Sequence, residues 1–242
     1  MNETPAHPQL IEDLVDANHI LFERGIVDAF GHVSARHDQQ PDRFLLARNL
    51  APGQVTAADI LQYHVDGAEP VRPDAPRGYL ERHIHSEIYK ARPDVMAVVH
   101  HHAPEVLPFC VVKGTRLRPL CHMCGFLGEG PPLFEIRDVA GETSDLLIRN
   151  QALGAALAQS LGAHRVVLMR GHGSTVVAES VRVAVYRAVY TVVNARLMLQ
   201  ALPLGEPTAL TAGEAEATRI TNEGQVDRPW NLWKQLAQGR KT

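Results

Sequence analysis

Three consecutive histidines, His100 to His102, end the apolar run "VMAVVHHH" and are the residues best suited to bind a metal. The run is rich in β-branched residues, which favours a β-strand. Because side chains on a strand alternate between its two faces, His100 and His102 should point to one side and His101 to the other. Two imidazoles placed two residues apart on a strand can bind one metal ion together.

A catalytic metal site usually has three protein ligands and one open position, so a third ligand is required. His172 is the best candidate, because it lies between two glycines in "MRGHGST", directly after the apolar segment "RVVLM". The glycines allow a sharp turn and close approach of the backbone. The local sequence leaves two interpretations open: a metal site, or half-exposed histidines with ordinary hydrogen bonds.

A cupin is a second way to use an H-x-H motif, since cupins add a glutamate a few residues later. Glu105 follows His102 one residue too soon, and it comes after Pro104 in a segment expected to be helical. The helical segments 150–161 and 180–201 also do not suit a small β-barrel. The sequence therefore disfavours a cupin.

The surrounding elements are predicted from hydrophobic periodicity and turn residues. Strands and helices alternate along the chain, and several strands look like hairpins, which favours a sheet that is not purely parallel and is covered by helices. Gly25 is expected to end the first helix. Helices are expected at 8–25, 80–92, 103–113, 150–162 and 180–202, and strands at 32–37, 43–47, 60–67, 95–102, 165–169 and 174–178.

Composition narrows the function classes. The chain has 242 residues, 45% of them hydrophobic and 21% charged, with a net charge of −3, so no basic field indicates nucleic-acid binding. No apolar run approaches the roughly 20 residues of a membrane helix, and no secretory signal is recognised. Three cysteines do not make a disulfide framework. We expect a cytoplasmic protein without a nucleic-acid or membrane partner.

The ordered motifs resemble those of the class II aldolase/adducin family, from about residue 8 to about residue 202. The resemblance rests on "GHVSAR" at Gly31–Arg36, on Glu81 at the start of a helix, on His100-x-His102, and on "RGHG" with His172 before a long helix. It implies a three-layer α/β/α domain with a central, largely antiparallel sheet.

The same resemblance implies the roles of several residues. His100, His102 and His172 would bind a divalent ion, Zn²⁺ or Mn²⁺, and Glu81 would be the catalytic acid or base. Family members are commonly homotetramers with active sites near subunit interfaces. We assign residues 1–205 to the catalytic domain. Residues 206–242 form a tail, whose Trp230 and Trp233 would pack on that domain or on a neighbouring subunit.

The sequence departs from the family where sugar-phosphate aldolases hold a phosphate. His32 replaces an asparagine, Arg48-Asn49 replaces a Thr-Gly turn, and Tyr79-Leu80 replaces a Ser-Ser pair. The small residues whose backbone amides would surround a phosphate are therefore missing. A guanidinium suits a carboxylate, and Tyr79 with Leu80 suits a flat apolar body. These changes predict a planar or unsaturated carboxylated substrate.

The segment "CHMCGFLGEG" contains Cys121 and Cys124 in a C-x-x-C, without a second pair to complete a four-cysteine zinc site. Plain buried cysteines are favoured over thiol chemistry. The match with the family places this segment near the substrate pocket. The predicted substrate-binding residues are His32, Ser34, Arg48, Asn49, Tyr79 and His122.

Within the family, "DAFGHVSARH", "PDRFLLARN" and "PLCHMCGFLG" resemble a branch of decarboxylases of aromatic compound catabolism. The resemblance implies decarboxylation of a hydroxylated aromatic carboxylate, such as a dihydroxyphthalate or hydroxypyridine dicarboxylate, or of a ring-cleavage product. One alternative is a sugar-phosphate aldolase or epimerase of the same fold. Another is an adducin-like scaffold without catalysis, against which the retained histidines and Glu81 count.

Overall fold

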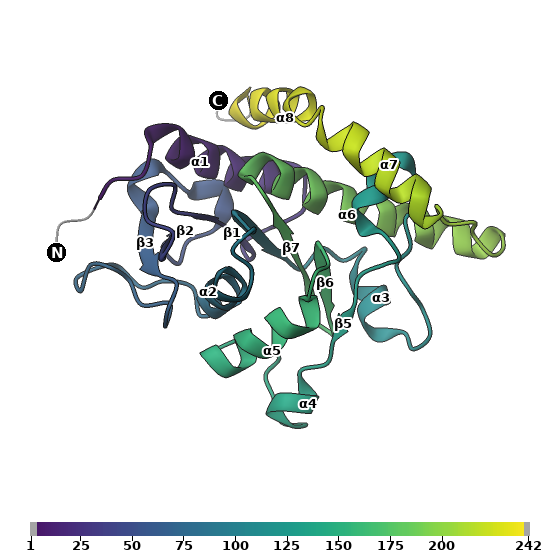
Figure 1. Cartoon of the computed structure of the whole chain (residues 1–242), viewed down its shortest axis with the longest axis horizontal. Coiled ribbons are helices and arrows are strands. Elements are labelled where there is room, and N and C mark those ends of the chain that lie inside the picture. The colour runs from purple at the N-terminus through teal and green to yellow at the C-terminus, as the bar shows by residue number, and fades with distance from the viewer. Residues whose placement is uncertain (1–3, 240–242) are drawn as a thin grey trace.

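A seven-stranded sheet forms the centre of the molecule in the computed structural model, which describes residues 4–239 (Figure 1). The strand order is β3-β2-β1-β4-β7-β6-β5, and every neighbouring pair is antiparallel except β5 with β6. The predicted fold class, a largely antiparallel sheet between helical layers, is confirmed. The strands are β1 (His32–Arg36), β2 (Arg43–Ala47), β3 (Ile60–His64), β4 (Ala97–His101), β5 (Leu133–Phe134), β6 (Val166–Met169) and β7 (Gly173–Ala178).

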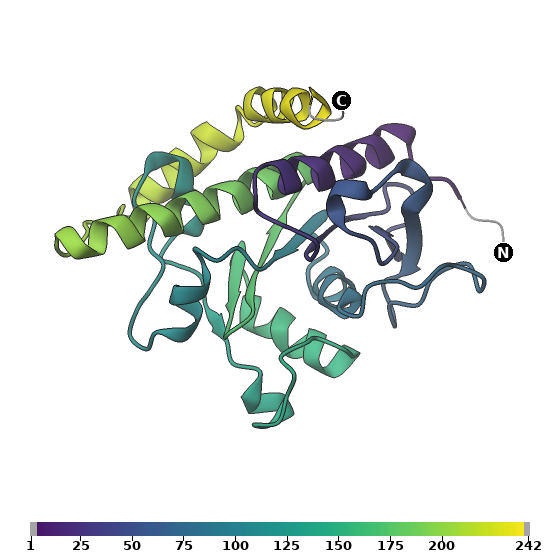
Figure 2. The ribbon, with the colours of Figure 1, turned by 180° about the vertical axis from the view of Figure 1, so that it is seen from behind.

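One face of the sheet is covered by α1 (Pro8–Glu23), α6 (Val181–Ala201) and the C-terminal helices (Figures 1 and 2). The first helix ends where the sequence predicts, because Gly25 adopts a φ of +67° that other residues rarely adopt. Alternate strand residues such as Val33 and Val99 pack against this layer. The alternation of the strands therefore decides which side chains meet these helices.

The opposite face is covered by α2 (Arg82–Ala91) and α5 (Gln151–Leu161), which pack against each other. Strand residues of the other parity, such as Phe44 and Val98, fill this second core. The short helices and 3₁₀ turns lie in the connections: η1 (Pro52–Gln54), η2 (Ala57–Asp59), α3 (Leu107–Val111), η3 (His122–Leu127), α4 (Arg137–Ala140) and η4 (Leu202–Leu204).

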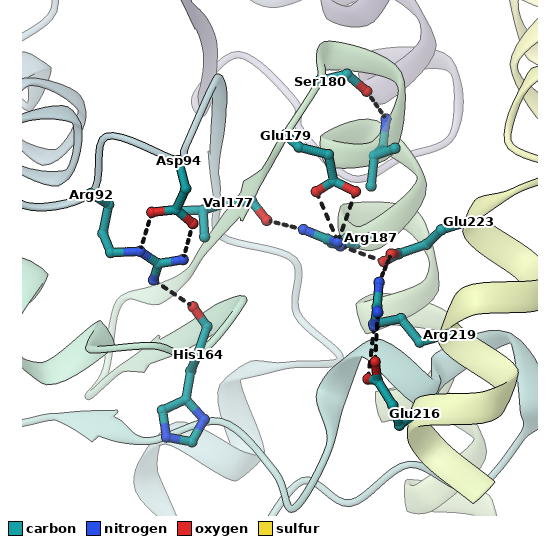
Figure 3. A network of polar contacts seen from close by, with 11 residues as sticks. Arg92, Asp94, His164, Val177, Glu179, Ser180, Arg187, Glu216, Arg219 and Glu223 are labelled. Atoms are coloured by element: carbon teal, nitrogen blue, oxygen red, sulfur yellow. Dashed lines mark hydrogen bonds and ion pairs between the residues drawn. The ribbon is translucent and has the colours of Figure 1, made fainter. Parts of the chain in front are cut away.

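The C-terminal segment forms two helices, α7 (Ala212–Glu223) and α8 (Asp227–Gly239), on the outside of the α1/α6 layer. Trp230 is 1% exposed within the core, and α8 packs along α1. The buried guanidinium of Arg187 on α6 binds the carboxylate of Glu223 on α7 at 2.6 Å (Figure 3). These contacts attach the tail within one chain, while its division from the domain at residue 205 stays a prediction.

The middle of the sheet aligns the residues of the predicted site. In the register of β1 and β4, His32 lies opposite His100. In the register of β4 and β7, His100 lies opposite Thr175 and His101 opposite Ser174. Three adjacent strands thus bring polar side chains to one end of a largely apolar sheet.

Candidate active site

The histidine triplet is divided by the strand as the sequence predicts. His101 is fully buried on the α6 side, where its Nε2 lies 3.0 Å from Ser174 Oγ. His100 is fully buried on the α2 side, and its Nε2 lies 2.8 Å from Nε2 of His102, just beyond the end of the strand. The two predicted ligands therefore converge on one point, away from His101.

His172 reaches the same point from the turn between β6 and β7. Both flanking glycines have positive φ angles, +65° at Gly171 and +152° at Gly173. A Cβ atom at Gly173 would lie 2.2 Å from the backbone oxygen of His101, so only glycine fits there. The turn places His172 Nε2 3.1 Å from His102 Nε2.

Glu81 lies at the N-terminal end of α2 and is buried. Its Oε1 accepts a hydrogen bond of 3.0 Å from the backbone N–H of Ile148. Its Oε2 lies 3.4 Å from Nε2 of His172 and 3.7 Å from Nε2 of His100. One oxygen is therefore held by the backbone while the other faces the histidines.

The four side chains fit a divalent metal ion, since their ligand atoms lie within 4.8 Å of one another. Ligands about 2.0–2.1 Å from a tetrahedral zinc ion are roughly 3.3 Å apart, close to the Nε2 separations here. Burial first, and then the neighbouring histidines, hold the pKa of His100 well below its usual range and lower that of His102. Neutral imidazoles with converging lone pairs are the form that binds a metal.

The outer nitrogens of two of these imidazoles have different surroundings. Nδ1 of His100 lies 3.2 Å from Thr175 Oγ1, which orients the ring from the neighbouring strand. Nδ1 of His172 is buried, and no hydrogen-bond partner for it is found among residues 4–239. The ring of His172 is therefore placed by its glycine turn rather than by a hydrogen bond at Nδ1.

A cavity of about 400 Å³ opens beside this cluster. Glu81 and His102 form part of its wall, and the His32 ring lies next to the His100 ring, tilted by 35°, with ring centroids 5.1 Å apart. The wall is mainly apolar, with a few polar groups, which is typical of a small-molecule site. The remaining lining residues are Ala29, Phe30, Gly31, Asn49, Leu50, Ala51, Arg77, Tyr79, Leu80 and Leu147.

Three of the predicted substrate-binding residues line this cavity: His32, Asn49 and Tyr79. The Tyr79 hydroxyl donates a hydrogen bond to the backbone oxygen of Leu50. The hydroxyl proton is therefore already used, and the ring forms part of the cavity wall. Burial raises the pKa of Tyr79 to about 12. Tyr79 therefore presents a neutral, largely apolar surface to the cavity.

The other three predicted residues lie outside the lining of this cavity. Arg48 binds the carboxylate of Asp59 at 2.6 Å. Ser34 is fully buried behind His32, and His122 is exposed on η3, next to α7. Their roles in binding substrate stay predictions.

Arg77 and Phe30 line the cavity and were missed by the sequence reasoning. A β-bridge between Arg48 and Gly78 brings the "PRGYLE" segment alongside "LLARN", and Asn49 N–H donates to the oxygen of Arg77. The Arg77 guanidinium has no ion-pair partner in the described chain. The sequence feature that could have indicated Arg77 as a lining residue is its position two residues before Tyr79.

Cys121 and Cys124 lie outside the lining of the cavity. Their sulfur atoms are 3.1 Å apart at the start of η3, and Cys124 is buried. The hydrogen bond between the thiols lowers the pKa of Cys121 to about 7 and raises that of Cys124. The pair is a local thiol contact, and the described structure does not connect it to the cavity.

The comparison with known families decides the classification of the chain. The profile of the class II aldolase and adducin N-terminal domain matches residues 12–199. The chain belongs to the class II aldolase/adducin family. Within this family it falls in the decarboxylase branch, as its similarity to two proteins named as decarboxylases shows.

Decarboxylase tropJ of Talaromyces stipitatus is 40% identical to this chain, over 92% of the chain and 92% of its own length. The 3,4-dihydroxyphthalate decarboxylase of Arthrobacter keyseri is 31% identical, over 82% of the chain and 81% of its own length. The structure of L-fuculose 1-phosphate aldolase from Glaciozyma antarctica matches with a TM-score of 0.77 and 21% identity, over 99% of this chain and 96% of the aldolase. At that identity the match shows a common fold.

A search of the described residues for a helix that is both long and apolar enough to cross a membrane finds none.

Proposed function

We propose that this class II aldolase/adducin family member is a divalent-metal-dependent decarboxylase of a hydroxylated aromatic carboxylate or of a carboxylated ring-cleavage product. The main observation behind the proposal is that a possible metal site lies directly beside a cavity. The cluster of His100, His102, His172 and Glu81 opens into a mainly apolar cavity, and Arg77 lines the same cavity. Relatives named as decarboxylases, one of them of 3,4-dihydroxyphthalate, support this reaction and substrate class.

The chain's own residues account for binding of such a substrate. Phe30, Tyr79 and Leu80 offer apolar surface to a flat ring. The guanidinium of Arg77 has no ion-pair partner among residues 4–239 and is suited to a carboxylate that the reaction leaves in place, and Asn49 adds an amide to the same cavity lining. A planar diacid therefore fits the cavity better than a flexible sugar phosphate.

The residues of the cluster account for the chemistry. A divalent ion bound by three imidazoles supplies a Lewis acid that stabilises negative charge on a substrate oxygen. We assign the proton transfer to Oε2 of Glu81, because Oε1 is occupied by the N–H of Ile148, and the proton goes to the carbon that has lost carbon dioxide. The apolar wall excludes water, which strengthens each of these interactions.

Two other functions use the same fold. A sugar-phosphate aldolase or epimerase would need phosphate-binding residues, and His32, Tyr79 and Leu80 stand in their place. A non-catalytic scaffold would have no use for four converging ligand groups next to a cavity. We further propose Zn²⁺ or Mn²⁺ as the metal, a cytoplasmic homotetramer as the assembly, and aromatic compound catabolism as the context.

The experiment that tests the proposal is a substrate panel with the purified protein loaded with Zn²⁺ or Mn²⁺. We expect carbon dioxide release from dihydroxyphthalates or hydroxypyridine dicarboxylates, and no cleavage of ketose phosphates. Arg77→Leu should raise KM more than it lowers kcat, because Arg77 contacts a group that does not react. Cleavage of a sugar phosphate without release of carbon dioxide would favour the aldolase. A protein that binds no metal and turns over neither class would favour the scaffold.

A further inference from the structure

A row of four hydrogen-bonded side chains runs from the cavity into the space between β1 and α2. Nδ1 of His32, at the cavity wall, lies 2.7 Å from Nε2 of His85. Nδ1 of His85 lies 2.6 Å from Ser34 Oγ, and Ser34 Oγ lies 2.8 Å from the hydroxyl of Tyr89. His85 and Ser34 are completely buried and Tyr89 is 1% exposed, so this row is shielded from solvent over most of its length.

The inner end of the row sets the direction of its hydrogen bonds. The buried Tyr89 hydroxyl is hydrogen-bonded to Ser34 Oγ, and no other acceptor for its proton is found among residues 4–239. The Tyr89 proton therefore goes to Ser34 Oγ. With the opposite direction, Tyr89 would accept from Ser34 and leave its own buried proton without an acceptor, which is unfavourable.

From this end each donor follows in turn. Ser34 accepts from Tyr89, so its single hydroxyl proton is donated to Nδ1 of His85. Burial lowers the pKa of His85 to about 3, so that imidazole is neutral and carries its proton on Nε2. The Nε2–H of His85 is then donated to Nδ1 of His32.

We propose that Tyr89, Ser34 and His85 are positioning residues that hold His32 in the tautomer with its proton on Nε2. In the described chain the hydrogen bonds of His32 use Nδ1 only, so Nε2 is left for the cavity. His32 is then a hydrogen-bond donor to the substrate oxygen on which negative charge develops. This assignment to a reacting oxygen rests on the proposed function, whereas the tautomer follows from the protein alone.

The consequence for the reaction follows from where the charge forms. A donor placed before the reaction begins stabilises a developing oxyanion more than the neutral oxygen of the ground state. The opposite tautomer of His32 would present a lone pair to that oxygen and repel it. Disturbing the row should therefore lower kcat and leave KM nearly unchanged.

The decisive measurement is the tautomer of His32 by ¹⁵N NMR of histidine-labelled protein, in metal-free and zinc-loaded forms, with the His32 signals assigned from a His32→Gln sample. In the wild-type protein we expect a proton on Nε2 and a bare Nδ1. In Ser34→Ala the row is interrupted, so both tautomers of His32 should be populated. kcat for carbon dioxide release should fall about tenfold, with KM within about twofold.

Two further variants separate this effect from a general loss of packing. Tyr89→Phe removes only the terminal donor and should shift the tautomer of His32 in the same direction, even if Ser34→Ala does not fold. Tyr63→Phe is the matched control, because Tyr63 lies in the same core and its buried hydroxyl has no hydrogen-bond partner among the described residues. It should leave both the tautomer and kcat unchanged.

The outcomes distinguish this inference from the proposed function. A wild-type His32 that carries its proton on Nδ1, or a tautomer unchanged in both Ser34→Ala and Tyr89→Phe, would overturn the inference whatever the substrate is. If the tautomer responds as expected but the panel releases no carbon dioxide, the row stands and the decarboxylase assignment fails. If the tautomer shifts while kcat stays constant, His32 does not contact the reacting oxygen.

Discussion

A polar cluster lies at each end of the paired strands β4 and β7. One cluster combines opposite charges, and the other brings similar groups together. At one end the buried guanidinium of Arg187 binds Glu223 at 2.6 Å, Glu179 at 3.0 Å and the backbone oxygen of Val177 at 2.7 Å (Figure 3). Arg219 completes this charge network by binding Glu223 at 2.8 Å. Positive and negative groups alternate, so that cluster is complete within the chain.

At the other end three imidazoles of the same kind converge, with Nε2 atoms 2.8 Å and 3.1 Å apart. The only acidic group in this cluster, Glu81, keeps its nearest oxygen 3.4 Å from the imidazoles. Like groups that are brought together by a glycine turn and a strand end could hold an added cation. Complementary charge thus marks the structural cluster, while convergence of similar ligand atoms marks the candidate metal site.

The largest effect is expected from removing one converging ligand. His102→Ala should abolish stoichiometric metal binding and lower carbon dioxide release by about 10³-fold or more, equivalent to roughly 4 kcal/mol of transition-state stabilisation. Metal content by elemental analysis and turnover on the panel measure both effects. Metal retained at one ion per chain in this variant would contradict the assignment of His102.

The matched control for His102→Ala is its neighbour in the triplet. His101→Gln removes an imidazole that faces α6 and contacts Ser174 rather than the cluster. We expect unchanged metal content. The free energy of unfolding should fall by about 1–3 kcal/mol, the typical effect of a disturbed buried hydrogen bond. Loss of metal from both variants would mean that the triplet is not divided between two faces in solution.

The next effect concerns the role of Glu81 beside the ligands. Glu81→Gln keeps an oxygen that can accept the N–H of Ile148, so the local fold should persist. Without an ionisable proton, kcat should fall by about 10²- to 10⁴-fold while metal remains bound. Full turnover would exclude Glu81 as the proton donor. Loss of the metal would instead identify Glu81 as a fourth ligand.

Whether the sequence predicts a feature of this molecule depends on how far apart along the chain the residues that determine it lie. Strand alternation and the glycines around His172 act locally, so the candidate metal ligands and the alternating cores could be predicted from short segments. The match with the family supplied the sheet arrangement and Glu81. The pairing of Arg48 with Asp59, in contrast, depends on how a loop folds back onto the end of a strand.

Other features depend on contacts between distant segments and could not be predicted in this way. Arg77 reaches the cavity because a β-bridge pairs its segment with that of Arg48. His85 meets His32 across the α2–β1 interface, 53 positions away in the chain. A motif identifies which residues are unusual, but the partners of those residues are decided by packing.

A smaller effect is expected when the structural cluster loses its buried acid. Glu223 is 6% exposed in its ion pair with Arg187, which is 3% exposed. Glu223→Gln leaves two arginines without their shared carboxylate, so we expect the free energy of unfolding to fall by about 3 kcal/mol. Denaturant unfolding measures this loss. Turnover per folded molecule should be unchanged, and a change in kcat would mean that the two ends of the strands are coupled.

The smallest effect is expected at the exposed partner of the same guanidinium. Glu179 binds Arg187 at 3.0 Å, but its side chain is 55% exposed, so water screens the pair and solvates the carboxylate. Glu179→Gln should lower the free energy of unfolding by no more than about 0.5 kcal/mol, and the difference should shrink further at 1 M salt. Because Glu179 and Glu223 share one arginine, measuring both variants under the same conditions isolates burial as the variable. Equal losses in the two variants would show that charge number, rather than burial, determines the stability of this cluster.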